Sequence, residues 1–259
     1  MSESILLQTD GAVAVLTLNR PEVLNALNEE MLLSLHQQLR RVGDDPAIRA
    51  VLLQARGRGF CAGADLVVDR GAAPPPAAET LRRLYHPVVA GLRAMAKPVV
   101  VAVNGVAAGA GMSLALAGDI LIAGESASFT QSFARVGLVP DAGSSWFLPR
   151  AVGEMRARAL ALTGKRMDAV QAQRFGLVWE VVPDDRLQGA AQELARELAA
   201  MPTRALAGIK RLYEGTMERD LPAQLGLEAE LQTAAAASED FREGVAAFLA
   251  KRKPVFTGR

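Results

Sequence analysis

The longest stretch of the sequence without a charged residue lies between Lys97 and Asp119 and covers 21 residues. A run of that length is long enough to cross a lipid bilayer as a helix. Pro98, Asn104 and four glycines interrupt it, and a β-branched first half is followed by small residues. This division predicts a buried strand, a glycine-rich turn and a helix of small residues in the core of a globular fold. We therefore expect no membrane partner.

Strands and helices alternate on both sides of this segment. Asp10-Gly11 is predicted to be the turn of a hairpin between residues 5–9 and 12–18, because both turn positions tolerate a positive φ. Asn28 is predicted to cap a helix that Gly43 closes. Apolar runs predict further strands over residues 48–55, 99–103, 119–123 and 177–182. The alternation favours an α/β fold.

Two regions have a composition of their own. Residues 69–80 contain three consecutive prolines and are predicted to form an exposed connector instead of a packed element. A helix over about residues 80–95 is expected next, with a kink at Pro87. The last helix is predicted to be capped by Ser238 and to bury a set of apolar residues, namely Phe241, Val245, Phe248 and Leu249.

The balance of charge and the rare residues exclude several classes of protein. There are 29 basic and 28 acidic residues, which leaves no broad electrostatic footprint for nucleic acid. One cysteine, Cys61, excludes a disulfide framework, and two histidines, His36 and His86, do not supply a histidine-rich metal centre. No basic patch precedes an apolar core near Met1, so the sequence predicts a cytoplasmic protein without a secretory signal.

Two glycine-rich turns, within residues 57–66 and 105–111, carry the sharpest chemical signal. The second turn lacks the Lys-Ser/Thr of a phosphate-binding loop and the spacing of a dinucleotide-binding turn. Small residues there can expose backbone N–H groups at a strand end or a helix start, and two such groups could form an oxyanion hole for a thioester carbonyl. Glycine also permits close packing of a helix on a sheet, so spacing alone leaves both interpretations open.

Four segments together resemble the enoyl-CoA hydratase/isomerase, or crotonase, superfamily. They are NRPEVLNALN (19–28), GFCAGADL (59–66) and residues 97–120 and 129–153. The resemblance continues to the end of the chain. It implies a ClpP-like spiral of β-β-α repeats over residues 1–200 that carries an acyl-CoA site. It also implies a C-terminal helical region over residues 201–259 that mediates trimerisation.

The resemblance assigns roles to particular positions. The backbone N–H groups of Ala64 and Ala110 would form the oxyanion hole. The substrate or its CoA moiety would contact residues beside these donors and on the facing wall, namely Ala62, Gly63, Asp65, Leu66, Gly109, Phe133 and Trp146. Arg20 and Lys253 would meet CoA phosphates, although each could equally be a solvated surface charge.

The acid/base positions separate the reactions that the superfamily performs. Its hydratases use two glutamates, and the corresponding residues here are Ser113 and Phe133, neither of which can give up and take back a proton near neutral pH. Asp141 is the remaining ionisable candidate. From chemistry alone it could be a turn or cap residue, whereas the family pattern places a catalytic carboxylate at this position. An apolar pocket would raise its pKa and make it a proton shuttle.

Within the superfamily the closest resemblance is to the ring-epoxide isomerases of phenylacetate breakdown. It implies conversion of 1,2-epoxyphenylacetyl-CoA to oxepin-CoA, a shift of a 3-enoyl double bond to position 2, or both. It implies no metal and no redox cofactor, since CoA arrives as part of the substrate. It also implies a homotrimer or a homohexamer.

Three alternatives remain open at this stage. His86 has the spacing of a general base found in dehalogenases of the superfamily, but a helical wheel places it opposite the apolar stripe, where a solvated histidine is expected. A hydratase with relocated acids and a catalytically silent protein that binds acyl-CoA or RNA are the others. Cys61 is predicted to be a small packing residue.

Overall fold

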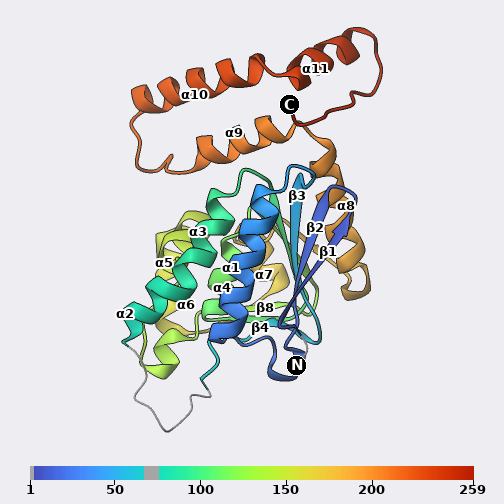
Figure 1. The fold of residues 1–259 in the computed structure, drawn as a ribbon. Helices are drawn as coiled ribbons and strands as arrows, with labels where there is room; N and C mark the ends of the chain where they lie inside the picture. The colour runs from blue at the N-terminus through green and yellow to red at the C-terminus, as the bar shows by residue number, and fades with distance from the viewer. Residues whose placement is uncertain (1–2, 67–75) are drawn as a thin grey trace.

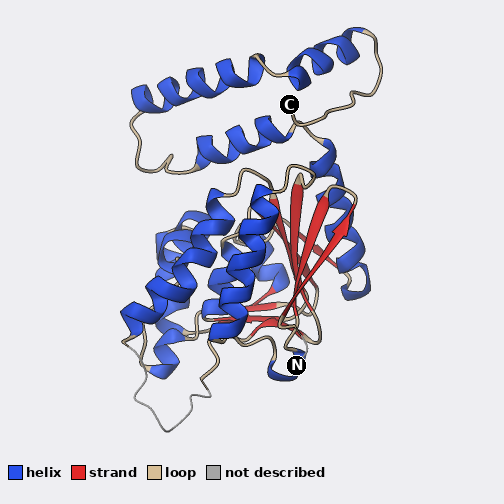
Figure 2. Ribbon diagram, viewed as in Figure 1, coloured by secondary structure: helices blue, strands red, loops and turns tan. Residues whose placement is uncertain are grey.

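The computed structural model describes residues 3–66 and 76–259 as two packed sheets covered by helices (Figures 1 and 2). One sheet has the strand order β1-β2-β3-β5-β7-β10 and the other the order β4-β6-β8-β9. The larger sheet contains β1 (Ile5–Asp10), β2 (Val13–Leu18), β3 (Ala50–Ala55), β5 (Val99–Val103), β7 (Ile120–Gly124) and β10 (Glu180–Val182). The smaller contains β4 (Gly59–Cys61), β6 (Val106–Ala108), β8 (Ser128–Thr130) and β9 (Arg166–Asp168).

Consecutive strands from β3 to β8 alternate between the two sheets. The chain therefore advances as a spiral in which each turn contributes one strand to each sheet. Neighbouring strands are parallel except in the β1–β2 and β8–β9 pairs, which are antiparallel. The α/β class and the spiral of repeats expected from the sequence are confirmed.

The larger sheet is buried on both faces. On one face, α1 (Glu29–Asp44), α3 (His86–Ala94) and α4 (Ala110–Leu116) enclose the main core. On the other face, α8 (Leu187–Ala200) packs against inward residues such as Val15, Leu52 and Ile122. Figure 1 shows α8 alone on its side, and the spiral's remaining helices are α2 (Ala77–Thr80), α5 (Ser144–Val152), α6 (Glu154–Thr163) and α7 (Ala169–Arg174). This two-sided burial explains the continuous apolar runs of the parallel strands.

Residues 5–44 follow the sequence prediction closely, with two shifts. The Asn28 side chain accepts the Met31 N–H at 2.9 Å and caps α1, as predicted. The helix does not close at Gly43 but continues to Asp44. The hairpin turn is also one residue later than predicted, since Asp10 pairs with Val13 and leaves Gly11 and Ala12 as the turn. Only Gly11 needs a positive φ, of 57°, and Asp10 is free to pair with Arg196.

The uncharged segment between Lys97 and Asp119 contains the predicted strand, β5, and the predicted helix, α4, but part of the predicted glycine-rich turn forms the short strand β6. Every residue of β5 and α4 is buried. In the part of the chain that the structure describes, none of the helices combines the length and the apolar character needed to cross a membrane.

The helix predicted over residues 80–95 differs in form. It begins at Ala77 as α2, passes through a π-helical turn at Leu81–Tyr85, and continues as α3. The wider turn precedes Pro87, whose ring and missing N–H disfavour a regular helix, and the kink predicted there stays a prediction. Residues 77–80 are helical, which corrects that end of the predicted connector. Its residues 69–75 lie outside the described residues.

The C-terminal helices α9 (Thr203–Tyr213), α10 (Leu221–Ala236) and α11 (Glu239–Leu249) project beyond the sheets (Figure 1). The Ser238 cap of α11 is confirmed by its bond to the Phe241 N–H at 3.0 Å. The predicted burial of the α11 apolar stripe is wrong, because Phe248 is 81 % and Leu249 75 % exposed. The stripe has the period of a packed helix, yet among the described residues no element covers it.

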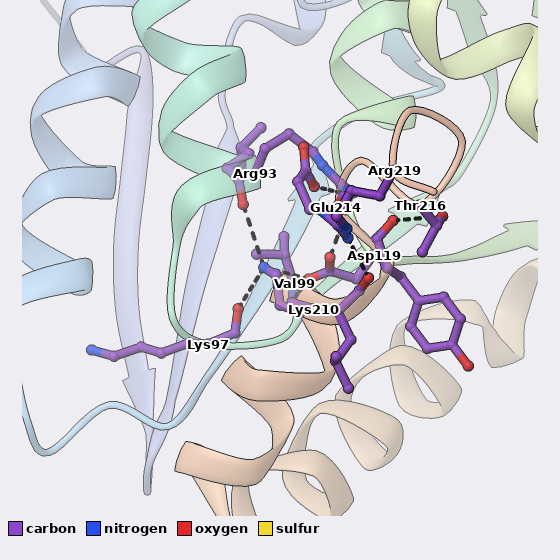
Figure 3. A network of polar contacts seen from close by, with 11 residues as sticks. Arg93, Lys97, Val99, Asp119, Lys210, Glu214, Thr216 and Arg219 are labelled. Atoms are coloured by element: carbon purple, nitrogen blue, oxygen red, sulfur yellow. Dashed lines mark hydrogen bonds and ion pairs between the residues drawn. The ribbon is translucent and has the colours of Figure 1, made fainter. Parts of the chain in front are cut away.

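An ion-pair network attaches α9 to the core (Figure 3). The Lys210 ammonium lies 2.7 Å from Asp119 Oδ2. The same carboxylate oxygen accepts the N–H of Val99, the first residue of β5, at 2.8 Å. Arg93 of α3 lies 3.6 Å from Asp119 and 2.6 Å from Glu214. The network therefore joins the end of α9 to a core strand and to α3.

Candidate active site

The Ala64 N–H is held in a fixed direction by a short parallel bridge. Leu27 N–H donates to the Gly63 carbonyl at 2.8 Å, and Asp65 N–H donates to the Leu27 carbonyl at 2.9 Å. The Gly63 carbonyl and the Ala64 N–H belong to one trans peptide, so they point in opposite directions. The Ala64 N–H therefore points away from Leu27, and the bridge leaves it available to a substrate.

The Ala110 N–H is the second candidate donor. Ala110 is the first residue of α4, so its N–H has no acceptor within the helix. Gly109 precedes it with a φ of 51° and lets the chain turn sharply from β6 into α4. A Cβ added to Gly63 would lie 2.9 Å from the Ala108 carbonyl oxygen and 3.7 Å from the Ala110 nitrogen. The structure thus brings together the two segments that the sequence predicted to form an oxyanion hole.

Asp141 lies in the turn before α5. The next residue, Ala142, has a φ of 48°, an uncommon conformation for a residue with a Cβ, and strain of this kind concentrates at functional sites. The Asp141 Oδ1 atom is buried and makes no hydrogen bond to the described residues. Burial raises the pKa of the Asp141 carboxyl group, and the charge of His86 acts in the opposite direction. These are the properties expected of a proton carrier.

Ser113 joins the oxyanion turn to the Asp141 turn. Its hydroxyl lies 3.3 Å from the Gly109 carbonyl and 3.0 Å from the Asp141 carbonyl, and it is fully buried. The Ser113 side chain therefore packs inside the fold. Because both carbonyls belong to residues of the candidate site, Ser113 also fixes their relative position.

Two buried aromatic side chains near these groups, Phe133 and Tyr85, form an aromatic wall. The Phe133 ring packs over the oxyanion turn, since a Cβ on Gly109 would lie 3.9 Å from it. Tyr85 is buried, and burial together with the charge of Asp141 raises the pKa of its phenol. Tyr85 was not among the site residues predicted from the sequence. The only signal for it was the proline two residues later, which accompanies the π turn that carries Tyr85.

Trp146 lies in a different set of contacts from Phe133 and Tyr85. Its ring lies under the Arg150 guanidinium at 3.9 Å and meets Phe147 edge-on with centroids 5.1 Å apart. It lines a cleft of about 350 Å³ shared with Arg93 and Met217. Both ring contacts of Trp146 are with residues of its own helix α5, and the cleft also borders the loop after α9. The place of Trp146 in the acyl pocket stays a prediction.

Further residues predicted to contact the substrate or CoA are either paired with each other or exposed. The Arg20 guanidinium lies 2.9 Å from Asp65 Oδ2, so both charges are already paired. Leu66 and Lys253 are exposed. His86 is exposed as predicted, although its charge reaches Asp141. Across residues 3–66 and 76–259 no cluster of three His, Cys, Asp or Glu side chains could hold a metal ion.

Cys61 lies behind the oxyanion turn. A Cβ on Gly111 would lie 2.3 Å from the Cys61 carbonyl oxygen, and the thiol is fully buried. Burial raises the pKa of the Cys61 thiol to about 12. The prediction of a packing role is therefore supported by both contact and burial.

We expect Cys61 to resist alkylation in the folded protein, because the thiolate is the reacting form and is suppressed at neutral pH. Mass spectrometry after iodoacetamide treatment should show no adduct under native conditions and one adduct in denaturant. Rapid labelling of the native protein would contradict this expectation.

The arrangement combines two directed N–H donors, one buried carboxyl group and an aromatic wall. It can stabilise negative charge on a carbonyl oxygen and move a proton on a neighbouring carbon.

Comparisons with known proteins show which family the chain resembles. A family model described as "Enoyl-CoA hydratase/isomerase" matches residues 8–259. The chain is 48 % identical to the 1,2-epoxyphenylacetyl-CoA isomerase of Escherichia coli (strain K12), with 100 % of both chains covered. It is 39 % identical to the 2,3-dehydroadipyl-CoA hydratase of that organism, again over 100 % of both.

Solved structures give the same result. The enoyl-CoA hydratase from Bacillus anthracis superposes with a TM-score of 0.93 at 32 % identity, covering 99 % of this chain and 100 % of that one. The family match, the full-length relatives and the shared fold all lead to one conclusion: the chain belongs to the enoyl-CoA hydratase/isomerase, or crotonase, family.

Proposed function

We propose that the protein is an acyl-CoA isomerase in which Asp141 moves a proton beside a thioester. The observation that carries the proposal is the buried Asp141 Oδ1, which lacks a hydrogen bond within the described residues and whose carboxyl group has a raised pKa. The Ala64 and Ala110 N–H groups, from adjoining segments, supply the matching donors. The reaction needs no cofactor beyond the CoA that is part of the substrate.

In the proposed reaction the thioester oxygen accepts hydrogen bonds from the N–H groups of Ala64 and Ala110. The Asp141 carboxylate removes a proton from C2, and the electron pair moves toward the carbonyl to form an enolate. For a 3-enoyl-CoA the same carboxyl group returns the proton at C4, and the double bond shifts to position 2. One carboxyl group is sufficient because it acts as base and then as acid.

We propose a ring-containing substrate as the second form of this reaction. The relative at 48 % identity is named for 1,2-epoxyphenylacetyl-CoA. The isomer that the family resemblance implies for that compound is the seven-membered oxepin-CoA. The aromatic wall formed by Phe133 and Tyr85 suits a ring better than a polar acyl chain. The carbon–carbon bond shared by the epoxide and the six-membered ring breaks, so that the epoxide oxygen becomes part of the seven-membered ring. The proton that leaves the carbon next to the thioester returns to the enlarged ring, so no atom is gained or lost.

Hydration is the second candidate, because the relative at 39 % identity is named as a hydratase. Adding water requires a base and an acid on one face of the double bond. The single proton of the Ser113 hydroxyl is directed at two backbone carbonyls, and Phe133 has no acidic proton to give. Both positions therefore favour isomerisation.

The test is a panel of 1,2-epoxyphenylacetyl-CoA, 3-enoyl-CoA and 2-enoyl-CoA substrates in water enriched in oxygen-18. The proposal expects isomers of unchanged mass from the first two, separated by chromatography, and no heavy oxygen in any product. Heavy oxygen entering a 2-enoyl-CoA would establish a hydratase. Binding of all three without any product would establish a silent family member.

The pH at which activity is lost on the acidic side should change when His86 is replaced. Because Asp141 must be ionised to remove a proton, activity is expected to fall as the pH drops through the raised pKa of Asp141. The charge of His86 lowers that pKa, so His86→Gln should move the acidic limb of the kcat/KM profile to higher pH. A profile that stays in place, or moves to lower pH, would contradict the electrostatic role given to His86.

We further propose a homotrimer or homohexamer. The exposed apolar side chains of α9–α11, including Ile209, Phe248 and Leu249, support burial against other copies. Sedimentation velocity should give a single species of three or six chains, and a monomer at micromolar concentration would contradict the proposal.

A further inference from the structure

We propose that Arg20 and Asp65 are positioning residues that hold the Ala64 N–H in the direction the thioester oxygen requires. This inference rests on the function proposed above. The Arg20 Nη1 atom lies 2.9 Å from Asp65 Oδ2 and donates to the Ala26 carbonyl at 2.6 Å. The two side chains are only 20 % and 15 % exposed. The ion pair is therefore largely withdrawn from solvent and better placed to impose geometry than a surface pair.

The contacts of this nitrogen enclose the peptide that carries the donor. Ala26 lies one residue before Leu27 of the bridge, and Asp65 lies one residue after Ala64. One guanidinium nitrogen thus ties the two chain segments together at one end of the bridge. At the other end, Ala62 N–H donates to the Leu24 carbonyl at 3.0 Å. Rotation of the Ala64 peptide would have to break one of these ties.

Arg20 is itself fixed by a buried asparagine. Its N–H donates to Asn25 Oδ1 at 2.8 Å, and its carbonyl accepts the Asn25 N–H at 2.8 Å. The Asn25 amide donates in turn to the Arg56 and Gly59 carbonyls, both at 2.9 Å. The turn therefore rests on the connection between β3 and β4.

The conformation of this turn is strained. Leu24 and Asn25 have φ values of 53° and 55°, and such a value is a genuine outlier for a bulky side chain such as leucine. Strain of this kind persists only where the surrounding contacts over-determine the backbone. The contacts of Arg20 and Asn25 do so here, and the segment they fix is the one paired with Ala64.

The competing role for Arg20 is the CoA phosphate contact implied by the family resemblance. The two roles differ in what they control. A phosphate ligand acts on the affinity for the CoA moiety, and its loss raises KM. A positioning residue acts on the transition state through the Ala64 donor, and its loss lowers kcat. The effect of changing Asp65 also separates these two roles. Its carboxylate cannot bind a phosphate itself, but it can orient Arg20.

The test compares Arg20→Gln, Asp65→Asn and the double variant in the isomerase assay. Each single change is expected to lower kcat about 10- to 100-fold, the range for a displaced or weakened oxyanion donor, and to leave KM within about threefold. The double variant should lose little more than either single one, because both act through one contact. Arg20→Lys should recover part of the loss, since one nitrogen makes both contacts.

The spectroscopic readout needs no turnover. The carbonyl stretch of butyryl-CoA, which has no double bond to move, should shift to lower frequency in the wild-type site and less in Arg20→Gln and Asp65→Asn. Asp10→Asn is the matched control, because Asp10 pairs with Arg196 at 2.6 Å at the opposite end of the β1–β2 hairpin. It should change neither kcat nor the carbonyl band.

Two results would overturn the inference. One is an Asp65→Asn variant with wild-type kcat and carbonyl band. The other is an Arg20→Gln variant that raises KM for the CoA ester but not for the pantetheine ester, which lacks the nucleotide phosphates. If the wild-type protein polarises the carbonyl but isomerises nothing, the proposed function fails while the band still decides the role of the ion pair. If a variant unfolds, the milder Arg20→Lys and Asp65→Asn carry the comparison.

Discussion

Replacing Asp141 by asparagine is expected to lower kcat for isomerisation by about two to four orders of magnitude, the usual contribution of a general acid/base. Asparagine matches the carboxylate in size, so the two N–H donors and the Phe133 wall should stay in place and KM should change little. The measurement is the rate of isomer formation from the best substrate of the panel. A variant that keeps activity within about threefold would remove Asp141 from the mechanism.

The same substitution should stabilise the fold. Because burial raises the pKa of Asp141, the ionised carboxylate opposes folding at any pH above its pKa in the unfolded chain, about 4. The asparagine side chain carries no such charge. At pH 7 we expect Tm to rise by about 2–4 °C, the shift that about 1 kcal/mol gives in a chain of this size. The gain should vanish near pH 3, where the carboxyl group is neutral in both states.

Asp168→Asn is the matched control for both effects. The Asp168 carboxylate caps α7 by accepting the Gln171 N–H at 2.7 Å, and asparagine is an equally good cap. Activity and Tm should therefore match the wild type. A parallel rise in Tm for both variants would show that the stabilisation is not specific to the site.

Replacing Asp119 by asparagine is expected to destabilise the fold by about 3–5 kcal/mol, because it leaves the charge of Lys210 in a partly buried place without its partner. The Lys210 side chain is only 13 % exposed, and burial already lowers the pKa of its ammonium group. The corresponding fall in Tm is roughly 10 °C. Thermal unfolding at one fixed protein concentration measures it, since association adds to apparent stability.

The partner variant separates charge from packing. Lys210→Met keeps the aliphatic stem, and Asp119 keeps the Val99 N–H and Arg93. The double variant Asp119→Asn/Lys210→Met should be more stable than Asp119→Asn alone, because it contains no uncompensated ammonium. A double variant that loses as much as the sum of the single ones would show that the two side chains act independently.

Sequence patterns correctly predicted helices and strands that are buried by other parts of the same chain. The Asn28 cap predicted the start of α1, and the β-branched run predicted β5 to the residue. The predicted burial of the α11 stripe was wrong for the opposite reason, although its Ser238 cap was confirmed. Its stripe has the spacing of a buried helix, but burial depends on a surface that no other described element of the chain supplies.

The residues of the candidate site also fall into those that the sequence predicted and those that it did not. Ala64, Ala110 and Asp141 were found through the resemblance, because motif positions keep their order along the chain. Tyr85 and the Arg20–Asp65 contact were not found, since both depend on three-dimensional packing. Tyr85 reaches the site through a π turn that no helical wheel reproduces. Arg20 and Asp65 are 45 residues apart and meet only when the first turn folds against the second segment.

The alternation of strands between two sheets has a consequence for how such a chain can change its chemistry. The turn built on β3 and β4 leads to Ala64, the next one leads to Ala110, and the third leads to Phe133 and Asp141. The first two supply main-chain groups, which no side-chain substitution deletes. In the proposed mechanism the side chains that choose the reaction lie on the second turn, at Ser113, and on the third, at Phe133 and Asp141. Substitutions at these side chains can therefore exchange one chemistry for another while the main-chain donors of the first two turns stay in place.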